Sequence, residues 1–129
     1  MAGTVTITEQ THKMIKKVTF DWLSSGSSTG MALGTATADT TKYYDGGVLR
    51  IVCLENTSTG YAIEINDSDG VDLLGSQGAA MTSGGADFGT STGVSMTGPG
   101  LSTVNSKISL NVTDSCGGGS TGVAIVYIR

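Results

Sequence analysis

Apolar and polar residues alternate along several short stretches of the chain, which is the pattern of half-buried β-strands. Val5 and Ile7 share one face of the first stretch, and Val18, Phe20 and Trp22 share one face of the second. The second stretch carries the only tryptophan and one of the two phenylalanines. Because aromatic side chains bury the most area, we expect this strand to anchor the core.

The middle of the chain contains its most apolar run, residues 48–54, which predicts a central strand. Its single charge, Arg50, is expected to pair with an acidic neighbour or to point to a rim. The preceding YYDGG predicts a hairpin turn, because Asp-Gly readily adopts the positive φ angles of tight turns. Residues 61–66 alternate again and predict the next strand.

Two further strands are predicted near the C-terminal end of the sequence. Residues 107–113 alternate, with Ile108, Leu110 and Val112 on one face. Residues 121–129 are apolar on both faces, which predicts either a central strand or one that another chain covers.

Glycine is frequent elsewhere, above all in residues 75–102, which show little periodicity and contain the only proline. A structureless loop of roughly 25 residues is unusual in a compact domain unless it is functional or held by a partner. We therefore expect one all-β domain over residues 1–129, with residues 1–13 as a possible N-terminal arm. The predicted architecture is a β-sandwich or jelly-roll-like barrel of about eight short strands with long Gly-rich loops.

Charge limits the classes of partner. The net charge is −4, whereas nucleic acids and anionic membranes select basic surfaces, so neither is an expected partner. The one basic cluster, His12-Lys13 with Lys16-Lys17, is interpreted as a solvated strand face. No apolar run approaches the roughly 20 residues of a membrane span, and no secretory signal is recognised. Synthesis in the cytoplasm without a signal peptide is expected.

The residues give little indication of catalysis. There is one histidine, His12, and no nucleophile motif accompanies any serine. The two cysteines, Cys53 and Cys116, are too far apart in sequence for a short-spaced zinc motif. Cys53 is expected to be a buried small hydrophobe, and both are expected to be free thiols. We expect a protein that is not an enzyme, with no catalytic, cofactor-binding or metal-binding residues and no cofactor.

The one candidate cation site is the sequence NDSDGVDLLG. Asp67, Asp69 and Asp72 lie around Gly70 in a chain that is otherwise poor in charge. An EF-hand loop requires glutamate at position 12, but placing Gly70 at position 6 puts Ser76 there. Asp side chains often bond to nearby backbone in turns, and glycine suits the left-handed position. A tight turn between two strands is therefore the preferred interpretation.

The overall layout of these strands resembles the small Gly/Thr-rich β proteins of tailed-bacteriophage structural modules. The stretches that carry the resemblance are TVTITEQTHKMIKKVTFDW, GVLRIVCL, YAIEINDSDGVDLLG, NSKISLNVT and TGVAIVYIR. Within that group the closest type is the capsid decoration (cement) protein. The resemblance implies a homotrimer on the outside of the virion head, bound to the major capsid protein and stabilising the shell.

Two alternatives stay open. The chain can be another phage structural part, at the neck, tail tube or tail tip. It can also be a module that binds host-surface glycans, since such sites stack sugars on exposed aromatic side chains. Tyr43, Tyr44 and Tyr61 are the candidates for that stacking.

Overall fold

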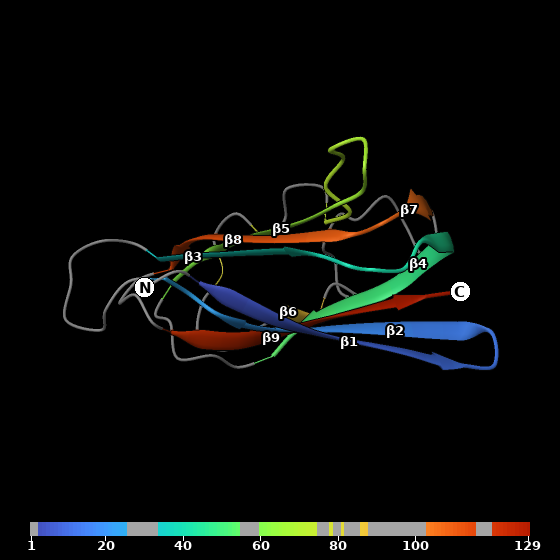
Figure 1. Cartoon of the computed structure of the whole chain (residues 1–129), viewed down its shortest axis with the longest axis horizontal. Coiled ribbons are helices and arrows are strands. Elements are labelled where there is room, and N and C mark those ends of the chain that lie inside the picture. Colours follow the sequence, from blue (N-terminus) through green and yellow to red (C-terminus); the bar gives the residue numbers. More distant parts are fainter. Residues whose placement is uncertain are drawn as a thin grey trace.

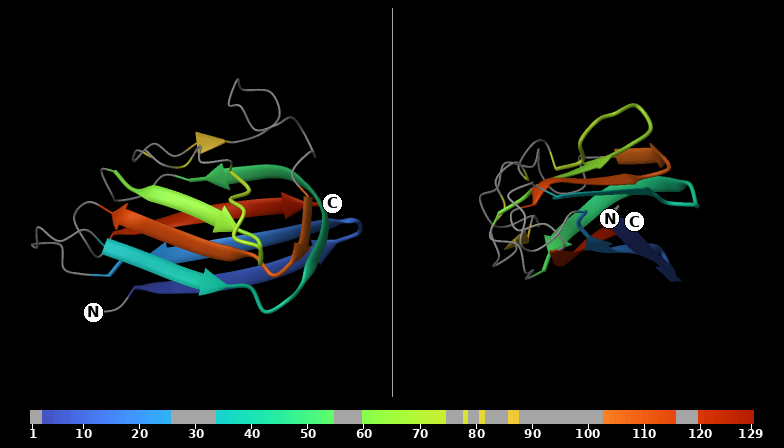
Figure 2. Two further views of the ribbon diagram at one scale, coloured as in Figure 1. Left: turned by 90° about the horizontal axis from the view of Figure 1, so that it is seen from above. Right: turned by 60° about the vertical axis from the view of Figure 1, so that its left-hand side comes forward.

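The computed structural model describes residues 3–25, 34–54, 60–74, 78, 81, 86–87, 103–115 and 120–129. These residues form β-strands and connections, and the strands make two antiparallel sheets that face each other (Figures 1 and 2). The strands are β1 (Thr4–His12), β2 (Ile15–Leu23), β3 (Gly34–Asp39), β4 (Tyr44–Cys53), β5 (Ala62–Asn66), β6 (Ala86–Asp87), β7 (Thr103–Ser106), β8 (Ser109–Ser115) and β9 (Thr121–Ile128).

The larger sheet, called sheet A, has the strand order β1-β2-β9-β4-β6, and β7 pairs with the other end of β4. The smaller sheet, called sheet B, has the order β3-β8-β5. The all-β prediction is confirmed. Of the two predicted architectures the chain adopts the sandwich, because the strands form two stacked sheets rather than one closed barrel.

The hydrophobic core lies between the inner faces of the two sheets. Val18, Phe20 and Trp22 are buried on β2, so the strand predicted to anchor the core does so. The Trp22 ring lies against the Tyr61 ring, with centroids 5.1 Å apart, and thereby joins β2 to the start of β5. The other large, fully buried side chains of the core are Val48, Ile51, Ile63, Ile65, Leu74, Ile108, Leu110, Val112, Val126 and Ile128.

The last strand, β9, lies between β2 and β4. Ala124, Val126 and Ile128 point into the core and are fully buried. Packing in the core between the two sheets accounts for the apolar inner face of β9. Its outer face is also apolar, and Val123, Ile125 and Tyr127 are only half-buried there.

The described part of the possible N-terminal arm over residues 1–13 contributes a strand to sheet A. Residues 4–12 form β1 and pair with β2 over their whole length, from Thr4 opposite Leu23 to His12 opposite Ile15. The inward-facing Val5 and Ile7 pack against the core, which fixes this strand in the sandwich. The two-residue connection to β2 contains Lys13, whose φ of 56° lies in the left-handed region.

Replacing Lys13 by glycine is expected to stabilise the protein. A non-glycine residue at positive φ costs about 1–2 kcal/mol, and glycine removes that strain while adding some unfolded-state entropy. We expect Lys13→Gly to raise the free energy of unfolding by about 0.5 kcal/mol, measured by urea denaturation. A lower free energy of unfolding for the variant would contradict this account of the turn.

The YYDGG stretch is not the hairpin turn that its Asp-Gly pair predicts. Asp45 and Gly46 lie inside β4, where residues 44–47 pair with β7. The register of β4 against β9 then shifts between Val48 and Arg50. The local sequence signal is overridden because β4 pairs with different strands at its two ends, and the glycines allow the backbone to pass close to Arg129.

Of the Gly-rich residues 75–102, the structure describes Gly78, Met81 and the short strand β6. Met81 and Tyr61 exchange two backbone hydrogen bonds, and Gly78 accepts one from Ile63. Gly78 and Met81 therefore lie along the outer edge of β5, whereas β6 pairs with Val52 and Cys53 of β4 in sheet A. A short strand expected around Val94–Met96 lies outside the described residues, and so does Cys116.

Candidate functional site

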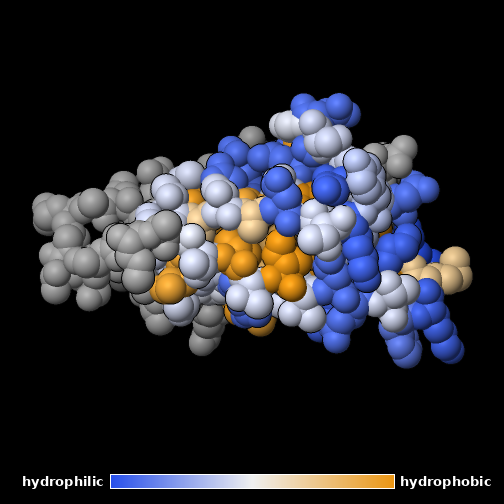
Figure 3. All heavy atoms as spheres, viewed as in Figure 1, coloured by the Kyte–Doolittle hydropathy of each residue, from blue (hydrophilic) through white to orange (hydrophobic). Residues whose placement is uncertain are grey.

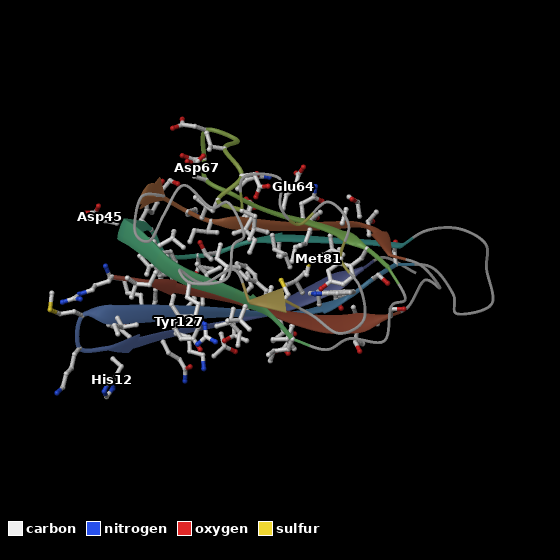
Figure 4. The ribbon with its side chains drawn as sticks, turned by 180° about the vertical axis from the view of Figure 1, so that it is seen from behind. His12, Asp45, Glu64, Asp67, Met81 and Tyr127 are labelled. Carbon is white, nitrogen blue, oxygen red and sulfur yellow. The ribbon has the colours of Figure 1, made fainter. Side chains whose placement is uncertain are left out.

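The aspartates of the NDSDG stretch form a turn, as predicted. The Asp67 carboxylate accepts hydrogen bonds from the amides of Asp69 (2.9 Å) and Val71 (3.0 Å). Gly70 has a φ of +82°, the conformation for which the turn selects glycine. The turn projects from the end of β5 on the sheet B side of the sandwich, where Figure 4 labels Asp67.

Asp72 also serves the backbone. Its Oδ1 accepts hydrogen bonds from the amides of Ile65 (3.1 Å) and Leu74 (3.0 Å) and so ties the returning chain to β5. Asp69 is exposed on the tip. Among the residues that the structure describes, no three His, Cys, Asp or Glu side chains gather into a metal-binding group.

The three tyrosines proposed for sugar stacking do not form one surface. Tyr44 and Tyr61 are each only 4 % exposed, so their faces are not available to a sugar ring. Burial is also the first cause of the raised pKa of both phenols. Tyr43 is 76 % exposed, with the Lys107 amine 5.6 Å from its ring centroid. Of the three candidates for sugar stacking, only Tyr43 is therefore accessible.

Cys53 is a buried free thiol, as predicted. Burial raises its pKa to about 12, although a hydrogen bond with Tyr61 acts in the opposite direction. The thiol is therefore protonated at neutral pH and is a poor nucleophile. His12, the one histidine, is exposed at the end of β1.

Glu9 has a structural role that the sequence interpretation missed. Its carboxylate accepts hydrogen bonds from the Thr41 hydroxyl (2.8 Å), the Tyr44 hydroxyl (2.9 Å) and the Lys42 amide (3.3 Å). It thereby fastens β1 to the connection between β3 and β4. The signal was present in the sequence, because Glu9 continues the inward-facing alternation of Val5 and Ile7.

Glu9 makes stability depend on pH. Burial acts to raise its pKa, but the hydrogen bonds from Thr41, Tyr44 and Lys42 outweigh it, so the pKa lies below its ordinary value of 4.5. A lowered pKa stabilises the fold above the unfolded-state value and loses that effect as the pH falls through the folded-state value. We expect Glu9→Gln to cost about 1 kcal/mol at pH 7 and to flatten the loss of stability below pH 4.5. The urea midpoints of the wild-type protein and the variant at pH 7 and pH 3.5 measure this effect. An equal fall of the midpoint between the two pH values in both proteins would contradict it.

In the smaller sheet the outer edge of β5 is covered, and the outer edge of β3 is bonded at Thr35. On the outer edge of β5, the backbone amides that point away from β8 donate hydrogen bonds to residues that follow β5 in the sequence. These bonds run from the amides of Tyr61, Ile63, Ile65 and Asp67 to Met81 O, Gly78 O, Asp72 Oδ1 and Val71 O. On β3, Thr35 accepts from the Ser25 amide and donates its own amide to the Ser25 hydroxyl. The outer edge of β5 is therefore a poor site for adding a partner's strand.

The outer face of sheet B is polar, and its two described ionisable groups, Asp39 and Glu64, are both acidic. Figure 3, a side view of the sandwich, shows hydrophilic side chains over this upper surface and apolar ones between the sheets. The described outward side chains of sheet B are Thr35, Thr37, Asp39, Ser109, Asn111, Thr113, Ala62, Glu64 and Asn66, of which only Ala62 is apolar. Such a surface suits contact with water.

The outer face of sheet A is different, because apolar side chains run along its centre. The pairing register places the outward side chains of sheet A in rows that run across the strands. The first row is Gln10, Lys17, Tyr127 and Arg50, the second is Thr8, Thr19, Ile125 and Val52, and the third is Thr6, Asp21 and Val123. The half-exposed Val52, Val123 and Ile125 form the centre, with cationic groups at one end and Asp21 toward the other.

Two hollows mark the ends of this face. One, here named the hairpin hollow, has a volume of about 330 Å³ and lies at the β1–β2 hairpin; its lining residues are Gln10, Thr11, His12, Ile15, Lys17 and Tyr127. The other has a volume of about 360 Å³ and contains Asp21 and Val123. In Figure 4, His12 and Tyr127 lie on the sheet A side, opposite Asp67 and Glu64. The sequence could not predict these hollows, because the row that joins β1, β2, β9 and β4 requires the strand order.

No protein-family model matches the chain, and searches of curated proteins and of solved structures found no match. The described residues include no helix with the length and apolar character of a membrane span. The described strands therefore carry an apolar outer face with charged ends on sheet A and a polar outer face on sheet B.

Proposed function

We propose that this protein is a structural component of a bacteriophage virion, a capsid decoration protein that binds the major capsid protein on the outside of the head. In this proposal the outer face of sheet A rests on the shell and the polar face of sheet B faces solvent. The observation that carries the docking face is the half-exposed apolar centre formed by Val52, Val123 and Ile125. The layout of the strands along the sequence supports the choice of a phage structural protein.

The physical case for docking through a face rests on the two surfaces and the edges together. A decoration protein acts by adding contacts between shell subunits, so it needs a rigid body and a surface whose burial is favourable. Sheet A offers apolar side chains on strands that neighbouring strands hold in place on both sides. Sheet B offers acidic and hydroxyl side chains, which lose hydration on burial without an apolar gain.

The first test is the location of the protein in virions. Mass spectrometry of purified, DNA-filled heads should detect the chain in a fixed ratio to the major capsid protein. Its absence from purified heads would overturn the proposal. Recovery with tails, but not heads, would move the protein to the neck or tail instead.

The second test is a pair of matched surface variants. Val123→Thr with Ile125→Thr keeps two β-branched residues on β9 but removes the apolar centre, and it should abolish binding to heads that lack the protein. Asn111→Ser with Thr113→Ser alters two outward residues of β8 without changing their polar character, and it should leave binding intact. Equal binding by both variants would contradict docking through sheet A.

The state of assembly separates the proposed function from its alternatives. The homotrimer proposed for a decoration protein should appear in light scattering coupled to size-exclusion chromatography, whereas rings of six would favour a neck or tail component. Of the three tyrosines considered for glycan stacking, Tyr44 and Tyr61 are buried and only Tyr43 is exposed, which gives the glycan-binding alternative little support.

A further inference from the structure

The hairpin hollow combines positive charge with apolar walls. Lys17 and His12 supply nitrogen donors, while Ile15, which is 41 % exposed, and the Tyr127 ring supply apolar surface. None of its lining residues is acidic. In a protein of net charge −4, this is a local reversal of sign.

Two cationic groups converge on one aromatic ring at this hollow. The Lys17 amine and the Arg50 guanidinium each lie 5.9 Å from the centroid of the Tyr127 ring. They occupy the strands on either side of β9, in the same cross-strand row as Tyr127. The nearest acidic side chain on this face of β2 is Asp21, four residues from Lys17 and therefore about 13 Å along the strand.

We propose that the hairpin hollow binds a carboxylate side chain of the docking partner, together with an apolar side chain next to it. The Lys17 amine pairs with the carboxylate, and the Tyr127 hydroxyl and the Gln10 amide are donors within the same row or hollow. The apolar neighbour packs on Ile15 and the face of Tyr127. This inference rests on the proposed function only for the identity of the partner, the head shell.

The chemistry of the hollow favours a carboxylate over a phosphate polyanion. A nucleic acid needs many phosphate contacts along an extended basic surface. Here the second and third rows of the same face carry Thr19, Ile125 and Asp21 rather than further cations. A single acidic side chain with an apolar neighbour matches both the small number of cations and the apolar walls.

The experiment uses the full chain, labelled with ¹⁵N, and a peptide pair. The probe is the capped peptide Ac-Leu-Glu-Glu-NH₂, and its matched control is Ac-Leu-Gln-Gln-NH₂. We expect the acidic peptide to shift the amide resonances of Gln10–Lys17 and Tyr127 with a dissociation constant in the millimolar range. The neutral peptide should bind at least about tenfold more weakly.

Two charge-reversal variants test the assignment to Lys17. Lys17→Glu should weaken binding of the acidic peptide at least about tenfold. Lys107→Glu makes the same change in net charge at another lysine that lies over a tyrosine, Tyr43, and should leave binding within about twofold. The amide spectrum of each variant reports whether it is folded.

Several outcomes would overturn the proposal. Equal weakening of peptide binding by both variants would show a general effect of net charge rather than a contact with Lys17. Equal binding of the acidic and the neutral peptide would show that the hollow does not recognise the carboxylate. If inorganic phosphate produced the same shifts with equal affinity, an apolar side chain of the partner would not contribute to binding in the hollow. Shifts at the same residues that grow with protein concentration alone would assign the hollow to a second copy of the chain. If the protein were absent from purified heads but still bound the acidic peptide at Lys17, the proposed function would be contradicted. The assignment of a carboxylate site to the hairpin hollow would then remain supported.

Discussion

Gly46→Ala is expected to lower the free energy of unfolding by about 3 kcal/mol or more, or to prevent folding. Gly46 has a φ of +140°, a conformation that L-residues rarely adopt. An added Cβ would also lie 2.2 Å from the backbone oxygen of Arg129. Moving Arg129 away to relieve this clash would break the two hydrogen bonds that it exchanges with Gly47. The variant therefore either keeps the clash or loses these bonds, and the φ strain remains in both cases.

Gly70→Ala is the matched control, because it separates backbone strain from the steric clash. Gly70 also has a positive φ, +82°, but no atom lies within 4 Å of its added Cβ. We expect a loss of about 1 kcal/mol for this variant. Urea denaturation of both variants measures the difference. Equal losses would contradict the close approach of β4 to the end of β9.

Thr40→Val is expected to cost about 2 kcal/mol, although valine has nearly the same shape. Thr40 is 1 % exposed, and its hydroxyl accepts from the Ile108 amide (3.0 Å) and donates to the Lys42 carbonyl (3.0 Å). Its amide donates to the Ile108 carbonyl (2.8 Å). Valine would leave the Ile108 amide without its partner beside a fully buried side chain, and that desolvation is the source of the cost.

Thr40→Ser provides the control for this prediction. Serine keeps the hydroxyl and loses only a methyl group, so it should cost about 1 kcal/mol. Thr37→Val, on the exposed face of β3, should change stability by less than about 0.5 kcal/mol. Thermal denaturation can rank the three variants. A smaller loss of stability for Thr40→Val than for Thr40→Ser would contradict the role of the hydroxyl. That role is to join the β3–β4 connection to the β7–β8 connection at Ile108.

The sequence was sufficient to predict the strands whose period-2 pattern reflects burial on one face. Val18, Phe20 and Trp22 illustrate this, since their alternation follows directly from one face packing on the core. The Asp67 turn was also predictable, because its hydrogen bonds are local in sequence. The structure confirms both of these patterns.

Features that depend on distant strands were not predictable in this way. The Asp-Gly pair at Asp45 signals a turn locally, yet pairing with β7 makes it part of β4. Tyr44 resembles an exposed aromatic in sequence, but Glu9 on β1 holds its hydroxyl inside. The row that joins Lys17 to Arg50 arises only because β9 lies between their strands.

The most direct test of the docking face is hydroxyl-radical footprinting of the protein on purified heads and free in solution. Binding through sheet A predicts that Tyr127 and Ile15 lose reactivity on heads, since both line the hairpin hollow. Val71, which is 58 % exposed in the turn on the sheet B side, should react equally in both states. Protection of Val71 with unchanged Tyr127 and Ile15 would contradict docking through the outer face of sheet A.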